Sequence, residues 1–383
     1  MKWHSFSEVV IDATSKFTKI KASDYLAQGR YKIIDQGKEP IAGYTDDANL
    51  VNGQLLPILI FGDHTRALKY EKDPIALGAD GAKALWVNPD LANPRYVYYY
   101  LRSIQIKEAG YSRHFKFLRE IEIPIPFKDG APDIDDQIRI AHFLGKVEGL
   151  IAQRKQHLQQ LDDLLKSVFL EMFGDPVRNE KGWDKPELKS FGKISTGNTP
   201  PRNEPANYDG DFIEWIKTDN ITGGVVFVTP AAEHLSEIGA RRARTVTNGA
   251  LLVACIAGSV ESIGRAALTD RPVSFNQQIN AIQPSKNVSP LYLYGLFKLC
   301  RAYIQSHATK GMKKILTKGD FEKITMIKPP FNIQNQFAVI VEKVEGIKSR
   351  YQQSLADLEA LYGALSQQAF KGELDLSRVP LQK

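Results

Sequence analysis

The sequence predicts an α+β fold, with two mixed α/β globular domains joined by two long antiparallel coiled-coil helices in a pseudo-twofold internal repeat. The main observation is a segment that occurs twice. Lys146 begins KVEGLIAQRKQHLQQLDDL, and Lys343, 197 positions later, begins KVEGIKSRYQQSLADLEAL. The register holds without a gap between residues 137–173 and 334–370. Similarity of this length at one fixed offset indicates an internal duplication.

Each copy of the repeat carries apolar residues at alternating steps of four and three. This spacing over four or more heptads predicts a coiled-coil seam. A polar residue interrupts each seam, Arg154 in the first copy and Lys348 in the second, and such residues can fix the register and the number of partners. We expect helices of about 35 residues, roughly 50 Å long. The seam residues that define the pattern are Ile140, Leu144, Val147, Ile151, Leu158, Leu161, Leu165, Val168 and Met172, then Phe337, Val341, Val344, Tyr351, Leu355, Leu358, Tyr362, Leu365 and Ala369.

The rest of each half is predicted to be globular. It is rich in Gly, Asn and Pro and contains alternating apolar runs such as 54–62 and 250–258, which are typical of short strands. A weaker repeat at Pro94 and Pro290 opens a short helix in each half. The predicted division is the first head (1–135), the central helix (136–175), the second head (176–332) and the distal helix with its tail (333–383).

Composition narrows the class of protein. The chain has 383 residues, of which 43% are hydrophobic and 25% charged, with a net charge of +6 and two cysteines. Two cysteines exclude a disulfide framework and a cysteine-based zinc cage. The start of the chain has no signal-like apolar stretch, and no run reaches the ~18–20 apolar residues that a membrane span needs. We therefore expect a cytoplasmic protein without a membrane partner.

Two similar helices carrying two dissimilar heads suggest a molecular ruler. Duplex DNA presents equivalent major-groove faces every ~34–36 Å, so two DNA-binding heads held apart by paired helices would recognise two short segments separated by an unread gap. The alternative is a non-catalytic coiled-coil scaffold that joins protein partners without DNA sequence specificity. Binding to a split site with a steep salt dependence would favour the first hypothesis.

The candidate DNA contacts lie on Gly- and Pro-shaped loops. Small hydroxyl and amide side chains among Lys and Arg suit contacts to phosphates and base edges. Such loops occur at 61–66, 195–202, 215–221 and 275–278, with basic clusters at 241–244 and 310–318. The candidate residues are His64, Arg66 and Lys69 in the first head and Asn198, Thr199, Lys217, Asn220, Arg242, Arg244 and Lys313 in the second.

With FGDHTR at 61–66, TGNTPPR at 196–202, WIKTDNITGG at 215–224, FNQQINAI at 275–282 and the twice-used KVEG helices, the chain resembles the specificity subunit of type I restriction-modification systems over essentially its whole length. The resemblance implies that the heads are target-recognition domains for double-stranded DNA and that the helices dock two methyltransferase subunits. It implies a non-catalytic chain that directs adenine-N6 methylation and, once restriction subunits join, cleavage. No cofactor is expected on this chain, and S-adenosylmethionine, ATP and Mg are expected on the partner subunits.

Motifs for catalysis by this chain are incomplete. The segment 328–331 reads KPPF, with Lys where an adenine methyltransferase needs a hydrogen-bond acceptor, and neither a GxGxxG nor a P-loop is found. Asp63 and His64 lack the further ligands of a metal site, so we expect a loop contact or a satisfied turn there. The tyrosines within 96–100 and 292–294 are expected to pack in the core or at an interface. One departure between the halves is FKDGAPD at 127–133, which is absent from the second copy, so the two docking joints are expected to differ.

Overall fold

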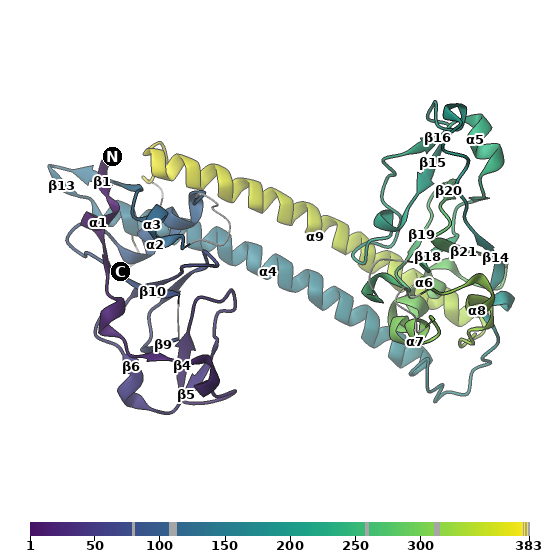
Figure 1. Cartoon of the computed structure of the whole chain (residues 1–383), viewed down its shortest axis with the longest axis horizontal. Helices are drawn as coiled ribbons and strands as arrows, with labels where there is room; N and C mark the ends of the chain where they lie inside the picture. The colour runs from purple at the N-terminus through teal and green to yellow at the C-terminus, as the bar shows by residue number, and fades with distance from the viewer. Residues whose placement is uncertain are drawn as a thin grey trace. The chain divides into compact units, whose positions relative to one another are not determined.

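The computed structural model forms two compact units, unit 1 (Met1–Lys155 with Gln353–Lys383) and unit 2 (Gln156–Gln352) (Figure 1). Two long helices, α4 (Ile134–Phe173, 40 residues) and α9 (Phe331–Lys371, 41 residues), each contribute one half to each unit. The residues that the structure describes are 1–78, 81–106, 113–256, 260–309, 315–377, 379 and 381.

Both long helices are longer than the roughly 35 residues expected from the seam alone. The extra turn of α4 arises because Asp133 accepts a hydrogen bond from the amide of Asp136 at 2.9 Å, which caps the first turn. Each helix then ends at a glycine in the left-handed region, Gly174 (φ 75°) and Gly372 (φ 77°). Glycine adopts this conformation without a Cβ penalty and so closes both copies in the same way.

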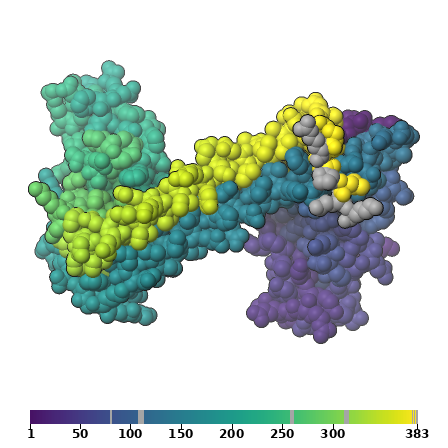
Figure 2. All heavy atoms as spheres, turned by 180° about the vertical axis from the view of Figure 1, so that it is seen from behind, coloured from purple at the N-terminus to yellow at the C-terminus, as the bar shows by residue number. Residues whose placement is uncertain are grey.

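The two long helices pair antiparallel within each unit, and their surfaces adjoin in Figure 2. In unit 1, Lys155 lies 2.8 Å from Glu359 in a salt bridge. In unit 2, the ring centroids of Phe169 and Phe337 are 5.3 Å apart in an edge-to-face contact. The residues of the predicted 4-3 series are buried or half-buried at these contacts. The predicted antiparallel coiled-coil pairing is confirmed.

The polar residue that interrupts the second seam, Lys348, belongs to a buried ion network in unit 2. Lys348 is 3% exposed and lies 2.9 Å from Glu345 and 3.2 Å from Asp162. Asp162 also accepts a hydrogen bond from Lys298 at 2.8 Å. Burial lowers the pKa of Lys348, but the bonds to Glu345 and Asp162 outweigh burial and the pKa is raised overall. A buried charge of this kind is retained only because its partners satisfy it.

Unit 1 contains a four-stranded antiparallel sheet in the order β2-β10-β7-β8, a five-stranded sheet ordered β3-β9-β4-β5 with β6 also on β9, and the pairs β1-β11 and β12-β13. Its strands are β1 (Lys2–Ser5), β2 (Val10–Asp12), β3 (Lys19–Ile20), β4 (Tyr31–Ile34), β5 (Gly43–Thr45), β6 (Val51–Asn52), β7 (Ile58–Gly62), β8 (Leu68–Glu71), β9 (Ile75–Gly78), β10 (Ala82–Val87), β11 (Glu122–Ile125), β12 (Phe127–Lys128) and β13 (Ala131–Pro132). Its shorter helices are α1 (Phe6–Val9), α2 (Pro94–Ser103) and α3 (Phe115–Leu118), with 3₁₀ turns at Thr14–Lys16, Ala22–Asp24 and Ala48–Leu50.

Unit 2 contains two four-stranded sheets, β14-β21-β18-β19 and β16-β15-β20-β17. Its strands are β14 (Gly192–Thr196), β15 (Ile213–Ile216), β16 (His234–Leu235), β17 (Thr245–Val246), β18 (Leu251–Ala254), β19 (Ala266–Leu268), β20 (Val273–Phe275) and β21 (Ile279–Pro284). Its shorter helices are α5 (Glu237–Arg242), α6 (Pro290–Leu299), α7 (Arg301–Ser306) and α8 (Lys318–Lys323), with 3₁₀ turns at Leu188–Ser190, Pro205–Asn207, Thr218–Asn220 and Val260–Ser262.

The two heads share a core topology. Each head has one antiparallel sheet in which the strand that comes first in the chain pairs with the strand that comes last. The last strand also pairs with a hairpin of two intermediate strands, which gives the orders β2-β10-β7-β8 in unit 1 and β14-β21-β18-β19 in unit 2. In each, a ten-residue helix that begins with proline, α2 or α6, packs its tyrosines into the core that this sheet shares with the long helices. The predicted internal repeat therefore extends to the heads, where the sequences differ.

Duplicated hydrogen bonds tie the long helices to these short ones. In unit 1, the buried side chain of Gln137 on α4 accepts a bond from the Asn93 amide at 2.7 Å, just ahead of α2. In unit 2, Gln334 on α9 accepts the equivalent bond from the Ser289 amide at 2.9 Å, just ahead of α6. Pairing a buried amide in this way avoids the cost of an unsatisfied backbone donor. The same device therefore fixes one helix junction in each unit.

Most tyrosines of α2 and α6 are buried in the core, which is one of the two positions expected for them. Tyr96 and Tyr292 are fully buried, and each hydroxyl donates to a backbone carbonyl, that of Pro124 and that of Ile327 respectively. Within the described ranges, neither the long helices nor the short ones carry the continuous apolar stretch that crossing a bilayer requires.

Candidate functional site

Three loops of the second head meet at one end of its sheets. The amide of Gly197 donates to the carbonyl of Ile279 at 3.0 Å, and the amide of Asn198 donates to that of Phe275 at 3.1 Å. A Cβ on Gly197 would lie only 2.2 Å from the carbonyl oxygen of Asn276. Only glycine therefore lets the 196–202 loop approach the 275–279 turn this closely.

Asn198 joins these loops to the basic segment that follows α5. Its side-chain amide donates to the carbonyl of Arg242 at 2.8 Å, and its side-chain oxygen accepts the amide of Arg244 at 2.7 Å. The neighbouring Thr199 hydroxyl donates to the side-chain oxygen of Gln277. The structure thus brings Asn198, Thr199, Arg242 and Arg244 together, with Asn198 holding the other loops in place.

Asn220 has a similar role in the 217–220 turn. Its side-chain oxygen accepts the amide of Lys217 at 3.0 Å, and its nitrogen donates to the carbonyl of Pro230 at 3.0 Å. These bonds fix the backbone from which the Lys217 side chain extends. Lys217 reaches Glu233, and its ammonium group lies 5.2 Å from the centroid of the Trp215 ring.

Glu233 connects Lys217 to a second cation. Its Oε2 accepts a bond from Arg202 at 2.8 Å, while its Oε1 accepts from Lys217. The bond from Lys217 and, after the opposing effect of burial, the bond from Arg202 hold the pKa of Glu233 below its ordinary value. The carboxylate therefore stays charged at neutral pH, and the three groups together carry one net positive charge.

Other cations of this surface are also paired. Arg242 bonds to Glu204, and Arg241 bonds to Glu237 at 2.6 Å. Arg244 is exposed and makes no ion pair with another described residue. The surface is consequently less positive than its arginines suggest, because three carboxylates pair with four of its cations and leave one net positive charge among these seven groups.

The candidates of the first head lie on one hairpin, His64 and Arg66 in the turn between β7 and β8 and Lys69 on β8. His64 is exposed, and Arg66 adopts a positive φ of 61° at the turn. Lys69 is largely buried and donates to the carbonyl of Asp35 at 3.0 Å. Burial lowers the pKa of Lys69, with Asp35 opposing this effect. Of the three candidates, Lys69 is thus directed into the head instead of toward a partner.

Asp63 precedes this hairpin turn and supports it from inside. Its carboxylate accepts the amide of Phe115 at 2.8 Å, and its carbonyl lies 3.0 Å from Nδ1 of His114. Asp63 is therefore a buried turn residue, one of the two outcomes expected from the sequence, whereas the neighbouring His64 is exposed.

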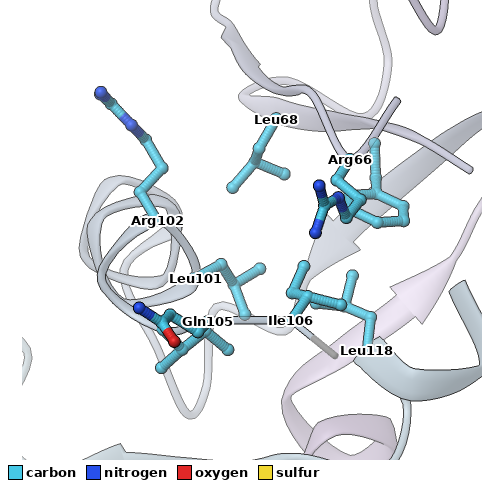
Figure 3. A pocket seen from close by; sticks show the side chains of 9 residues that line it. Arg66, Leu68, Leu101, Arg102, Gln105, Ile106 and Leu118 are labelled. Atoms are coloured by element: carbon cyan, nitrogen blue, oxygen red, sulfur yellow. The ribbon is translucent and has the colours of Figure 1, made fainter. Parts of the chain in front are cut away.

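A pocket of about 680 Å³ opens beside the same hairpin, and Figure 3 shows the side chains around it. Arg66 directs its guanidinium group toward Ile106, while the rest of the lining is mostly apolar. The pocket and the hairpin place Arg66 and His64 on the same part of the first head. The described residues that line it are Phe61, Arg66, Leu68, Leu101, Arg102, Ile104, Gln105, Ile106 and Leu118.

Lys313, the remaining candidate, lies outside the described residues. Sequence reasoning did not single out Arg202 or Glu233. Arg202 ends the TGNTPPR loop, so the motif could have indicated it, whereas nothing in the sequence around Glu233 marks it. Over the ranges that the structure describes, no three His, Cys, Asp or Glu side chains come close enough to hold a metal ion.

Comparison with known proteins gives one consistent result. Residues 180–359 match the family model of the type I restriction modification DNA specificity domain. The specificity subunit of the type I restriction enzyme EcoR124I/EcoR124II from Escherichia coli is 24% identical over 355 residues, which cover 88% of this chain and 84% of that protein. The HindI specificity subunit from Haemophilus influenzae is 30% identical over 172 residues, covering 43% and 36% respectively.

Solved structures share the fold. The S subunit of a type I restriction-modification system from M. genitalium has a TM-score of 0.63 at 13% identity, over 96% of both chains. A chain from a structure described as the basis of complex assembly and conformational transition of the type I R-M system has a TM-score of 0.54 at 17% identity, over 97% of this chain and 98% of that one. The predicted fold class is confirmed by these neighbours.

Proposed function

We propose, from the premise that this chain belongs to the type I restriction-modification specificity subunits, that each of its heads binds one segment of a split double-stranded DNA target. As a DNA sequence-specificity subunit, the chain selects the site on which such a system acts. The observation that supports two half-sites is the repeated core topology of the heads, combined with loops that do not repeat. Similar frameworks with different loops suit two different short sequences.

The loop cluster of the second head supports direct contact with bases. Asn198 and Asn220 have most of their polar atoms engaged in shaping the loops, so we assign them positioning roles. Arg244 is exposed next to Asn198 and is the best placed cation for DNA. In the first head, His64 and Arg66 take this role on the β7–β8 hairpin. Lys69 is a weaker candidate because Asp35 holds it.

We further propose that the two long helices dock two methyltransferase subunits. The support is an exposed apolar pattern that repeats: Leu150 and Leu361 in unit 1, and Ile347 and Leu164 in unit 2, are 38% to 49% exposed. A Cβ at Gly149 or Gly346, beside these residues, would meet nothing within 4 Å. Glycine costs up to ~1 kcal/mol in a helix relative to alanine, so an open glycine at the same place in both copies suits close approach by a partner.

In this proposal the chain carries out no chemical step. Its part is to bind and orient DNA, while the methyltransferase subunits hold S-adenosylmethionine and transfer a methyl group to N6 of adenine. Restriction subunits, where a system has them, supply ATP and Mg for translocation and cleavage. A target adenine must leave the base stack before it is methylated.

The test is to express the chain with its modification subunits and to sequence the methylated adenines. We expect one split motif, and replacing residues 1–135 with another head should change only one half of it. A motif that is continuous, or that changes in both halves, would contradict the proposal. A variant carrying alanines at Gly149 and Gly346 with intact assembly would remove the close-approach argument.

A second experiment tests whether the helices set the gap. We expect that deleting four residues from each long helix, about one turn or ~6 Å, shortens the unread gap by about 1–2 base pairs. The control replaces the same residues with alanine, which keeps the helix length. An unchanged gap after the deletion would show that the helices do not measure it.

A further inference from the structure

The cluster formed by Arg202, Lys217 and Glu233 in the second head has an unusual division of charge. Each oxygen of the Glu233 carboxylate serves a different cation, Oε2 for Arg202 at 2.8 Å and Oε1 for Lys217. All three side chains remain between 32% and 53% exposed, so a ligand in solution can reach them. Two cations thus share one accessible anion.

Aromatic rings hold the two cations in place independently of that anion. The guanidinium carbon of Arg202 lies 4.5 Å from the ring centroid of Tyr208 and 4.7 Å from that of Trp215. The Lys217 ammonium lies 5.2 Å from the same Trp215 ring. Trp215 is itself buried, and its indole N–H donates to the carbonyl of Asn198 at 3.3 Å. Cation–π contacts of this kind pre-organise the cations, so little conformational freedom is lost when an anion binds.

We infer that Arg202 and Lys217 form a binding site for one backbone phosphate of DNA, and that Glu233 occupies this site as an internal counter-ion until a phosphate replaces it. A phosphodiester, like a carboxylate, presents two unesterified oxygens and accepts charge-assisted bonds from Arg and Lys. The site adjoins the Asn198 loop through Trp215, so a phosphate held here would lie beside the loops that face bases. The inference rests on the proposed function in taking DNA as the partner.

This exchange has a measurable consequence. Each phosphate neutralised by a protein cation contributes about 0.9 to the negative slope of log K against log salt for duplex DNA. When Glu233 is displaced, it becomes an unpaired anion near DNA, which offsets part of the gain. Removing its charge should therefore both strengthen binding and steepen the salt dependence.

The experiment compares the full-length chain with its Glu233→Gln variant, using a short DNA duplex of arbitrary sequence over a series of salt concentrations. We expect E233Q to bind roughly 3–10-fold more tightly at low salt, with a slope steeper by up to about 0.9. Adding Arg202→Gln to this variant should reverse most of the gain. If Glu233 only positions the two cations, E233Q will instead bind more weakly, which would overturn the inference.

Glu214→Gln is the matched control, because it changes the net charge equally. Glu214 lies next to Trp215 on β15 and pairs with Arg271 at 3.0 Å, but successive residues of a strand face opposite sides. We expect E214Q to bind as the unmodified chain does, and equal gains in E214Q and E233Q would also overturn the site. Sequence preference is measured separately on target duplexes. If the chain showed no sequence preference, the proposed function would be refuted. The salt series on arbitrary DNA tests the phosphate site whether or not the chain has a sequence preference.

Discussion

Replacing Gln334 with leucine should destabilise unit 2 by a predictable amount. Gln334 is fully buried on α9. Its side-chain oxygen accepts the amide of Ser289 at 2.9 Å, and its side-chain nitrogen donates to the carbonyl of Pro329 at 2.8 Å. Leucine has a similar size but offers neither bond. Gln334→Leu therefore leaves one buried donor and one buried acceptor without a partner.

The expected cost follows from these two groups. A buried polar group that loses its partner costs about 1–3 kcal/mol, so two of them cost about 2–6 kcal/mol. The apolar leucine side chain offsets roughly 1–2 kcal/mol of this through burial. The middle of these ranges, a cost of about 4 kcal/mol offset by about 1.5 kcal/mol, gives an expected net loss in the free energy of unfolding of unit 2 of about 2–3 kcal/mol.

The assay combines urea unfolding with hydrogen exchange. Trp183 and Trp215 report on unit 2, so their fluorescence should show a lower midpoint when Trp3 and Trp86 of unit 1 are replaced by phenylalanine in every variant. The Ser289 amide should also exchange faster. Gln336→Leu, exposed on the same helix, is the control and should change neither readout. A Gln334→Leu variant as stable as this control would refute the reasoning, and Gln137→Leu should show the same loss in unit 1.

Two further predictions concern single contacts in unit 2. Gly197→Ala places a Cβ about 2.2 Å from the Asn276 carbonyl oxygen. This change should weaken recognition of one half-site by roughly tenfold, or about 1.4 kcal/mol. Methylation kinetics on targets altered in either half measure the effect, and unchanged recognition of both halves would exclude a role for the loop. Burial raises the pKa of Asp162, but Lys298 and Lys348 outweigh it, so the folded pKa lies below the ordinary 3.8. The stability that this carboxylate contributes is then complete above about pH 5 and is lost as pH falls through the folded pKa. Asp162→Asn should reduce the pH dependence of unit 2 stability below about pH 5, and an unchanged acid-unfolding curve would contradict this.

The long helices could be predicted because their signal is local. A 4-3 spacing needs only neighbouring residues, and the burial of Leu144 and Val341 follows it directly. The shared topology of the heads could not be predicted in this way. Its central pairings join distant segments, such as Leu85 with Asp12 in unit 1 and Asn280 with Thr196 in unit 2. Short strands with unrelated sequences carry no local sign of which partner they choose.

The candidate site shows the same limit for side chains. Sequence indicates which loops are polar, but it does not indicate which cations a distant carboxylate holds. In the sequence, Lys69 and Lys217 both look like loop lysines, yet Lys69 is buried against Asp35 and Lys217 is paired with the half-buried Glu233. These partners are 34 and 16 positions away in the chain. Whether each lysine is available to contact DNA therefore depends on the tertiary fold.

The division of the long helices between the units has a consequence for synthesis. Unit 2 is one continuous segment, Gln156–Gln352, whereas unit 1 needs residues 353–383 to complete its core. There, Phe370 packs against Tyr96 and Tyr100, with ring centroids 5.4 Å and 5.2 Å away. Because a ribosome makes Phe370 long after those tyrosines, the head that emerges first finishes folding last. In the interval Tyr96 and Tyr100 on α2 lack their contact with Phe370, and transiently exposed apolar surface of this kind promotes aggregation.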